Sequence, residues 1–376
     1  MLNRLHLKNF KCFEDHKFIL KPLTVLSGLN GTGKSSVLQA LLLLRQSYQQ
    51  GVLQENAIVL NGDLVHIGTG KDALFEGAKK EEIFFELIFF DGKGHERNAS
   101  WLCGYSSESD VLDVLSGVGD VQVIDLSLFT NDFQYLQAER IGPRRFFDLN
   151  FLVKKHNQLG IKGEYATHFL QEFGDRSLKA GLKGLLHTEA ASDTLRDQVE
   201  AWMREVSPGI RINLIPNAGT DTVSLQYSFA MGTQVSNNYR ATNVGFGITY
   251  ILPILVAVLS STPGTLILVE NPEAHLHPRG QAMMGELLAR AAACGIQIIV
   301  ETHSDHVLNG IRVAVHDGKL KPEDAQLHYF QRREQDGFAE VVSPTIDRDG
   351  RSDQWPDGFF DEWDKNLEAL LTPREE

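Results

Sequence analysis

A glycine-rich segment near the N-terminus constrains the fold of this chain more than any other feature. Residues 28–35 read GLNGTGKS and match the pattern G-x-x-x-x-G-K-[ST]. An apolar run, residues 23–26, precedes the segment, and a Leu-rich stretch without Pro or Gly, residues 34–46, follows it. Between a buried strand and a helix start, glycines let backbone N–H groups turn inward around a phosphate. The sequence therefore predicts a strand, a phosphate-binding loop and a helix, in that order.

This loop is expected to bind ATP with Mg²⁺. Lys34 would neutralise the β- and γ-phosphates, and the Ser35 hydroxyl would ligate the metal ion. A glycine-rich turn with a chance lysine is the alternative, and it leaves the flanking strand and helix unexplained. The predicted nucleotide-binding residues of the loop are Asn30, Gly31, Gly33, Lys34, Ser35 and Ser36.

Two further apolar runs lead into polar residues. Residues 266–269 read LILV and are followed by Glu270, and residues 296–300 are followed by the sequence ETHSD. Runs that are almost wholly apolar suit strands buried on both faces, as in a central parallel sheet. A buried strand holds an acid rigidly near a metal ion, so Glu270 is the predicted Walker B carboxylate. Ser35 and Glu270 are the predicted metal-site residues.

The residues that follow these two runs are the most specific signal in the chain. Residues 270–278 read ENPEAHLHP, and residues 302–304 read THS. With the glycine-rich loop, this set resembles the ABC-type ATPase heads of the RecF, OLD and SMC group. In that group the Walker B region reads D-E-P-E-x-H-L-H-P and the next strand ends in T-H-S. The resemblance implies an α/β fold of the P-loop NTPase type, with His303 as the switch residue near the γ-phosphate.

The resemblance also implies a dimer. In this group a signature motif binds nucleotide across the interface between two heads, and residues 243–247, NVGFG, match it. Each ATP is then expected to lie between Lys34 of one subunit and Gly245 of the other, and hydrolysis reopens the dimer. The signature residues expected to contact nucleotide are Asn243, Gly245 and Gly247.

Further segments resemble a bacterial branch of the same group. They are AERIGPR at 138–144, GEY at 163–165, WP at 355–356 and GFFD at 358–361. Several relatives in that branch look like parts of antiphage defence modules. The resemblance therefore implies a nuclease or toxin effector as partner, in addition to a second copy of the chain, and DNA is a further candidate.

Two positions depart from the pattern of the group. Glu270 replaces the usual Walker B Asp, and Asn271 stands where the group places its catalytic Glu. An amide cannot take a proton from water. Either Glu273 has taken over as the base, which we favour, or hydrolysis is slow and the protein is an ATP-dependent scaffold or switch. The predicted catalytic residues are Glu273, Glu270, Asn271 and His303.

Other kinds of site are disfavoured. A zinc cluster is conceivable from its residue types, but the ATPase pattern already accounts for these positions, which are His275, His277, His303, His306 and Glu273. Asp347 and Asp349 are similar to the D-x-D of the Toprim nuclease domain that OLD proteins carry after the ATPase. Because about seventy residues follow His303, too few for that domain, an acidic turn is favoured.

Three arginines near the middle of the chain leave two alternatives open. Arg140, Arg144 and Arg145 could contact phosphates of a nucleotide or of DNA. They could equally form ion pairs with the surplus of acidic residues, and the sequence does not decide between these readings.

Composition indicates a folded, cytoplasmic protein. Lys and Arg number 36 against 49 Asp and Glu, a net charge of −13, which argues against a uniformly basic coat or a polybasic membrane anchor but allows a local basic groove. Three cysteines far apart in the sequence favour a reducing compartment. The longest apolar run, residues 248–259, is too short to span a bilayer, and residues 1–10 lack the features of a signal peptide.

The periodicity of apolar residues indicates how the chain is organised. A strand-rich N-terminal lobe and the central sheet are expected to form the core, with loops in the Ser-, Gly- and Asp-rich stretch 104–120. Helices are expected near 166–173 and 194–206, without sustained heptads. The expected domains are an ABC-type ATPase core at 1–150 and 209–345, a helical insertion at 151–208 and a C-terminal tail at 346–376.

Overall fold

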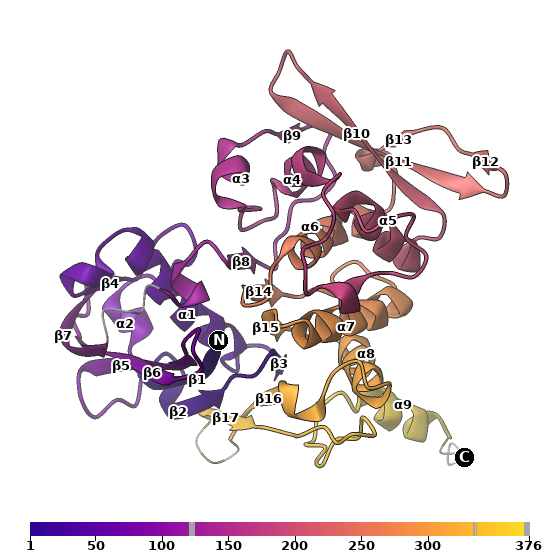
Figure 1. The fold of residues 1–376 in the computed structure, drawn as a ribbon. Helices are drawn as coiled ribbons and strands as arrows, with labels where there is room; N and C mark the ends of the chain where they lie inside the picture. Colours follow the sequence, from indigo (N-terminus) through magenta and orange to yellow (C-terminus); the bar gives the residue numbers. More distant parts are fainter. Residues whose placement is uncertain (120–124, 334, 336, 372–376) are drawn as a thin grey trace.

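The strand before the phosphate loop lies inside a six-stranded sheet that is parallel except for one edge strand (Figure 1). The structure is a computed structural model that describes residues 1–119, 125–333, 335 and 337–371. The inner strands of this six-stranded sheet are apolar and buried, which confirms the central parallel sheet expected from the sequence. In spatial order the strands are β17 (Ala339–Val342), β16 (Ala325–Arg332), β3 (Leu23–Gly28), β15 (Gln297–Glu301), β14 (Leu266–Glu270) and β8 (Phe133–Leu136).

The order of these strands determines which residues meet at the carboxyl edge of the sheet. β15 lies between β3, which leads into the phosphate loop, and β14, which ends in the predicted Walker B acid. In register, Glu301 pairs with Leu26 on one side and with Glu270 on the other. Open α/β sheets bind ligands at the carboxyl ends of their strands. The phosphate loop and both acids therefore share the edge where a ligand is expected.

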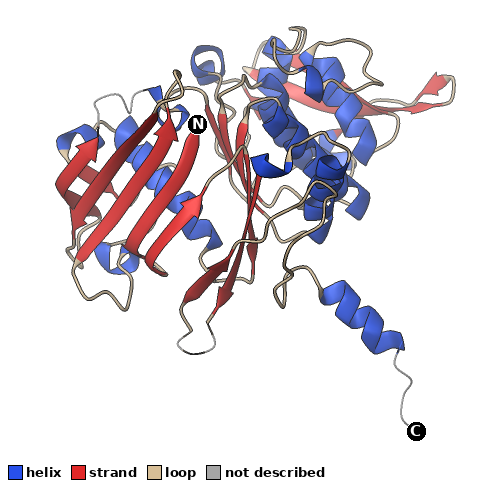
Figure 2. Ribbon diagram, turned by 60° about the horizontal axis from the view of Figure 1, so that its bottom comes forward, coloured by secondary structure: helices blue, strands red, loops and turns tan. Residues whose placement is uncertain are grey.

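An antiparallel sheet forms the N-terminal lobe (Figure 2). The expectation of loops at residues 104–120 is wrong in part, because β7 pairs antiparallel with β6 within this stretch. Burial of Leu112 and the backbone ladder outweigh the low strand propensity of the Ser, Gly and Asp residues. Residue 120 lies outside the described part. In spatial order the strands are β2 (Phe13–Ile19), β1 (Leu2–Phe10), β5 (Glu82–Phe90), β6 (Glu96–Gly104), β7 (Val111–Gly119) and β4 (Ala57–Val59).

Helix α1 (Lys34–Gln49) connects the two sheets. Its apolar residues share one core with residues of the N-terminal lobe and with Leu266, Leu268 and Ile299 of the central sheet. Arg45, near the end of the helix, is buried and donates hydrogen bonds to the carbonyls of Leu128 and Thr130. Short helical turns complete this part and the loops elsewhere: α2 (Gly70–Ala73), η1 (Leu53–Glu55), η3 (Ser127–Phe129), η4 (Lys183–Leu185), η5 (Ala241–Asn243) and η6 (Pro322–Asp324).

The opposite face of the central sheet is covered by three helices, α6 (Phe246–Ser260), α7 (Pro278–Ala293) and α8 (Asp305–His316). Alternate residues of the inner strands point to the two faces, so Ile298 and Val300 join this second core while Ile299 faces α1. Within the described ranges, no helix is both long enough and apolar enough to cross a bilayer.

Helices and a third sheet lie over α6 (Figure 1). The helices expected near residues 166–173 and 194–206 are confirmed as α4 (Ala166–Phe173) and α5 (Leu195–Val206), and α3 (Phe151–His156) precedes them. Thr194 caps α5 by accepting a hydrogen bond from the Asp197 backbone N–H. The third sheet is formed by β9 (Phe147–Asp148), β10 (Ile210–Asn217), β11 (Thr222–Met231), β12 (Gln234–Val235) and β13 (Tyr239–Arg240).

The C-terminal segment packs on β16 through aromatic side chains. Phe359 is 1% exposed and lies 5.2 Å from the Tyr329 ring and 4.9 Å from the Trp355 ring. The Tyr329 hydroxyl donates a hydrogen bond to the carbonyl of Asp357. The final helix, α9 (Glu362–Leu371), follows this contact.

Phe359→Ala should lower the free energy of unfolding by about 3 to 5 kcal/mol, because the lost ring leaves a cavity against β16. Leu370→Ala is the matched control, since Leu370 is 83% exposed, and it should change the stability by less than about 0.5 kcal/mol. Chemical denaturation measures both. Equal effects of the two substitutions would contradict the docking of the tail.

Candidate nucleotide site

The phosphate loop has a backbone that only glycine fits at two positions. A Cβ at Gly28 would lie 2.1 Å from the Phe330 carbonyl oxygen, and one at Gly33 would lie 2.3 Å from the Cys12 sulfur. Both glycines also have positive φ, 136° and 106°. Gly33 is the N-cap of α1, so the positive end of a 16-residue helix faces the loop. The loop and helix therefore have the geometry of the anion site that the sequence predicts.

The Lys34 ammonium is held inside this loop. It is buried and donates hydrogen bonds to the carbonyls of Gly28, at 3.0 Å, and Leu29, at 2.6 Å. Burial lowers the pKa of Lys34, and the negative charge of Glu301 opposes that shift. Lys34 is thus positioned at the loop, where its charge fits the oxygens of a β- or γ-phosphate.

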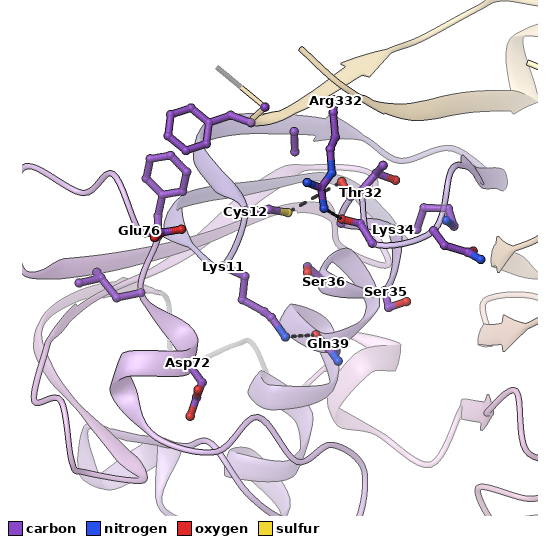
Figure 3. A pocket seen from close by; sticks show the side chains of 18 of the residues that line it. Lys11, Cys12, Thr32, Lys34, Ser35, Ser36, Gln39, Asp72, Glu76 and Arg332 are labelled. Atoms are coloured by element: carbon purple, nitrogen blue, oxygen red, sulfur yellow. Dashed lines mark hydrogen bonds between the residues drawn. The ribbon is translucent and has the colours of Figure 1, made fainter. Parts of the chain in front are cut away.

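The loop forms one wall of a pocket of about 860 Å³ (Figure 3). Three cations that sequence reasoning missed also line it, namely Lys11, Lys71 and Arg332. Lys11 donates a hydrogen bond to Gln39, and Arg332 at the end of β16 donates one to the Gly31 carbonyl. No sequence motif marks Lys11 or Arg332, because each reaches the pocket from a strand end distant in the chain. All six residues predicted for the loop line the pocket: Asn30, Gly31, Gly33, Lys34, Ser35 and Ser36.

The two acids at the strand ends have different partners. Ser35, the predicted Mg²⁺ ligand, donates a hydrogen bond of 3.0 Å from Oγ to Oε1 of Glu301. Glu270 instead accepts one from the Tyr135 hydroxyl at 2.8 Å and one from the Ala138 backbone N–H at 3.1 Å. Glu270 therefore faces β8, on the far side of β14 from the phosphate loop.

Glu301 is a buried acid that sequence reasoning did not single out. Glu301 is 6% exposed, and its Oε2 atom is buried without a hydrogen-bond partner among the described residues. Burial, and after it the negative charge of Glu270, raises the pKa of Glu301 to about 7. A buried oxygen without a donor fits a cation, so the residues present suit a nucleotide bound with Mg²⁺.

Asn271 occupies a sharp turn after β14. Its φ is 43°, a left-handed conformation that Asn adopts more readily than Glu. The backbone N–H of Asn271 donates to the Glu301 carbonyl, and its side-chain Oδ1 is buried without a described partner. The residue that departs from the group's pattern is therefore one that suits the backbone here.

Arg140 holds this turn in place, which neither reading of the sequence anticipated. Its guanidinium donates hydrogen bonds to the carbonyls of Glu270 and Asn271 and lies 4.5 Å from the Tyr250 ring. Burial lowers the pKa of Arg140 to about 10. Arg144 and Arg145 are exposed, so phosphate contacts stay open for those two.

Glu273 and the T-H-S segment form one hydrogen-bonded unit. Oε2 of Glu273 accepts from the Thr302 hydroxyl at 2.7 Å, and Oε1 accepts from the His303 backbone N–H at 2.8 Å. His303 lines the pocket, and partial burial together with the charge of Lys34 lowers its pKa. The structure thus brings Glu273 next to the predicted switch residue, at the edge shared with the phosphate loop.

The predicted signature residues do not line this pocket. Asn243 and Gly245 are exposed at the start of α6. Gly247 packs against the turn after β14, since a Cβ there would lie 2.3 Å from the His275 carbonyl oxygen. The structure therefore brings together the loop, Glu301 and His303, but not the signature segment.

The residues considered for other sites have ordinary structural roles. The His275 ring packs on Phe246 and Tyr250, and His277 caps α7. Across the described chain, no group of three or more His, Cys, Asp or Glu is arranged to hold a metal ion. The Asp347 carboxylate accepts hydrogen bonds from the backbone N–H groups of Asp349 and Arg351, which confirms the acidic turn.

Comparisons with known proteins agree with this geometry. A model described as an AAA ATPase domain matches residues 1–99, and one described as an AAA domain, putative AbiEii toxin, Type IV TA system, matches residues 125–309. A family of unknown function matches residues 320–370. The OLD nuclease of Thermus scotoductus is 50% identical over 334 residues, covering 81% of this chain and 59% of that protein. The chain thus spans 59% of the length of this relative.

Solved structures of SMC heads share the fold. An SMC head bound to the C-winged helix domain of ScpA gives a TM-score of 0.55 at 15% identity, over 92% of this chain and 98% of that one. The Smc head domain with an extended coiled coil from Pyrococcus furiosus, bound to the C-terminal domain of ScpA, gives 0.53 at 13% identity over 99% of both chains. The fold is therefore that of a P-loop ATPase head of the SMC type. The family models and the OLD relative, together with this fold, fit an ABC-type ATPase of the RecF, OLD and SMC group.

Lys34→Ala should raise the dissociation constant for ATP by about tenfold or more, because it removes the cation at the phosphate loop. Isothermal titration calorimetry measures the change. Lys8→Ala removes a partly exposed lysine of β1 outside the pocket and should leave the affinity unchanged. Unchanged affinity in a folded Lys34→Ala protein would overturn the assignment of the loop.

Proposed function

We propose that this protein binds ATP with Mg²⁺ at the phosphate loop and hydrolyses it. The observation that carries the proposal is the convergence of Lys34, Ser35, Glu301 and His303 on one pocket at the carboxyl edge of the parallel sheet. When bound, Mg²⁺ would offset the negative charge of the phosphates. Lys34 would bind the β- and γ-phosphates, and the backbone N–H groups of the loop would orient them.

Glu273 is the proposed base, with His303 beside it. A carboxylate has about four lone-pair sites, so Glu273 can accept a proton from water while it accepts the hydrogen bonds from Thr302 and His303. Those two bonds would fix the direction of the carboxylate toward the attacking water. Asn271 would orient water without deprotonating it.

The second half of the site is proposed to come from another copy of the chain. The exposed Asn243 and Gly245 lie at the N-terminus of the 15-residue helix α6, and Gly247 lies in its first turn. Such a helix end attracts a phosphate, yet these residues do not line the pocket of their own protomer. A homodimer with ATP between Lys34 of one protomer and Gly245 of the other would use both surfaces.

The dimer is proposed to drive or regulate a nuclease or toxin effector in DNA repair or antiphage defence. Support comes from the OLD nuclease relative and from the family model whose description names a putative AbiEii toxin. DNA is a candidate ligand in this role, and the exposed Arg144 and Arg145 are the residues that would contact its phosphates.

A second candidate function is an ATP-dependent switch with little hydrolysis. Two observations favour it: Asn271 replaces the acid of the family pattern, and each oxygen of Glu273 already accepts a hydrogen bond from the T-H-S segment. In this case the bound ATP itself would keep the dimer closed around a partner.

Gly245→Trp should abolish ATP-dependent dimerisation while leaving ATP binding intact. A Cβ at Gly245 meets no atom closer than 3.9 Å, so the protomer itself accommodates a side chain there. Light scattering should show doubling of the mass of the wild type with a non-hydrolysable ATP analogue but not with ADP. The matched control is Gly219→Trp, in the open turn between β10 and β11, which should dimerise normally. Equal masses for all three proteins would count against the ATP-sandwiched dimer.

Glu273→Gln should lower ATP turnover by about 10² to 10⁴ if Glu273 is the base. Gln keeps the size of the side chain and an oxygen that can accept from His303, so the loss would report on the charge. Phosphate release and ATP affinity are measured together, with Glu139→Gln at an exposed ion pair as control. Slow turnover in the wild type would instead favour the switch, and rapid turnover indifferent to Glu273→Gln would exclude Glu273 as base.

A further inference from the structure

We propose that Glu301, and not the Walker B residue Glu270, is the protein carboxylate that interacts with Mg²⁺ at this site. The inference rests on the proposed binding of ATP with Mg²⁺ at the phosphate loop. It assigns the metal-facing role to the end of β15, and it gives Glu270 a structural role at the end of β14.

The first support is the contact with Ser35. The hydroxyl of this residue is the group through which P-loops hold Mg²⁺. Its partner here is Oε1 of Glu301 at 3.0 Å, and Glu301 lines the pocket whereas Glu270 does not. The acid that touches the metal-binding hydroxyl is thus the one on β15.

The second support is that both oxygens of Glu270 accept hydrogen bonds on the side of β14 that faces away from the phosphate loop. Its Oε1 accepts from Tyr135 and its Oε2 from the Ala138 backbone N–H, both on the side of β8. Turning Glu270 toward the loop would break both bonds. The buried Tyr135 hydroxyl would then have no hydrogen-bond partner, which costs free energy. Glu270 therefore joins the end of β14 to the segment after β8.

The third support is the orphaned oxygen of Glu301. Oε2 is buried and receives no hydrogen bond from the described residues. A buried carboxylate oxygen without a donor is unfavourable, and a divalent cation or a water molecule of its shell removes that cost. Oε2 of Glu301 can therefore accept a cation beside the Ser35 hydroxyl, the group through which P-loops hold Mg²⁺.

Strand order places Glu301 closer to the phosphate loop than Glu270. β15 lies directly beside β3, and β14 is one strand further away. Because Glu270 and Glu301 are paired in register, both side chains end at the same edge, but only Glu301 neighbours the phosphate loop. Glu301 can reach Ser35 directly, because no strand lies between β15 and β3.

The test is the Mg²⁺ dependence of nucleotide affinity in the full chain, measured by calorimetry with ATPγS in the presence of Mg²⁺ or of EDTA. Mg²⁺ should tighten binding to the wild type. In Glu301→Gln, the increase in ATPγS affinity caused by Mg²⁺ should be smaller by about tenfold or more. Its affinity in EDTA should stay at or above that of the wild type. Glu270→Gln is the matched control and should keep the gain. Binding of Mn²⁺ with ATPγS, followed by the loss of the free Mn²⁺ EPR signal, gives a second readout.

The outcomes separate the inference from the proposed function. A wild type that binds no ATPγS under either condition would refute nucleotide binding itself. If Mg²⁺ increases the ATPγS affinity of the wild type and of Glu301→Gln equally, the inference alone is overturned. It is also overturned if Glu270→Gln loses the increase in affinity. Thermal melting checks that each variant folds. If Glu301→Gln does not fold, Glu301→Asp keeps the charge, withdraws the carboxylate from Ser35, and should also reduce the gain.

Discussion

The pairing of β15 between β3 and β14 is the constraint on which the site depends. Two backbone hydrogen bonds continue this ladder beyond the strands: Thr302 N–H donates to the Leu26 carbonyl at 3.0 Å, and Asn271 N–H donates to the Glu301 carbonyl at 2.8 Å. They fix the turns after the strands relative to one another. The phosphate loop, the T-H-S segment and the turn after β14 are therefore held at a fixed spacing, as a preorganised site requires.

Placing two carboxylates side by side at a buried edge has an electrostatic cost, and the surrounding residues offset it. Glu270 receives two hydrogen bonds, and Arg140 places its charge against the turn that follows it. Glu301 receives one bond from Ser35, and its pKa is raised to about 7 by burial and by Glu270. The acid that is less well satisfied is the one that faces the pocket. That asymmetry is what a cation site needs, because a fully paired carboxylate would lose its bonds on binding the metal.

Much of this arrangement could be predicted because its signals are local. The glycine pattern at residues 28–35 and the apolar runs before Glu270 and Glu301 each specify a strand and the turn after it. β7 was missed because its strand state depends on the ladder to β6 more than on its own composition.

The partners of the acids could not be predicted, because they depend on contacts between distant segments. Glu301 meets Ser35 across 266 positions of sequence, and Glu270 meets Tyr135 across 135. Arg332 likewise reaches the site from a segment whose sequence carries no phosphate-binding pattern. The motif identified the edge of the sheet, and only the contacts of the two acids show which one faces the loop.

We propose that this edge is an ATP site completed by a second protomer. An experimental structure of the Glu273→Gln protein with ATP and Mg²⁺ tests this. We expect a dimer in which the triphosphate lies in the phosphate loop against Lys34, with the partner's Gly245 at the γ-phosphate. A nucleotide bound elsewhere, or a triphosphate in the loop of a monomer with the signature segment exposed, would contradict it.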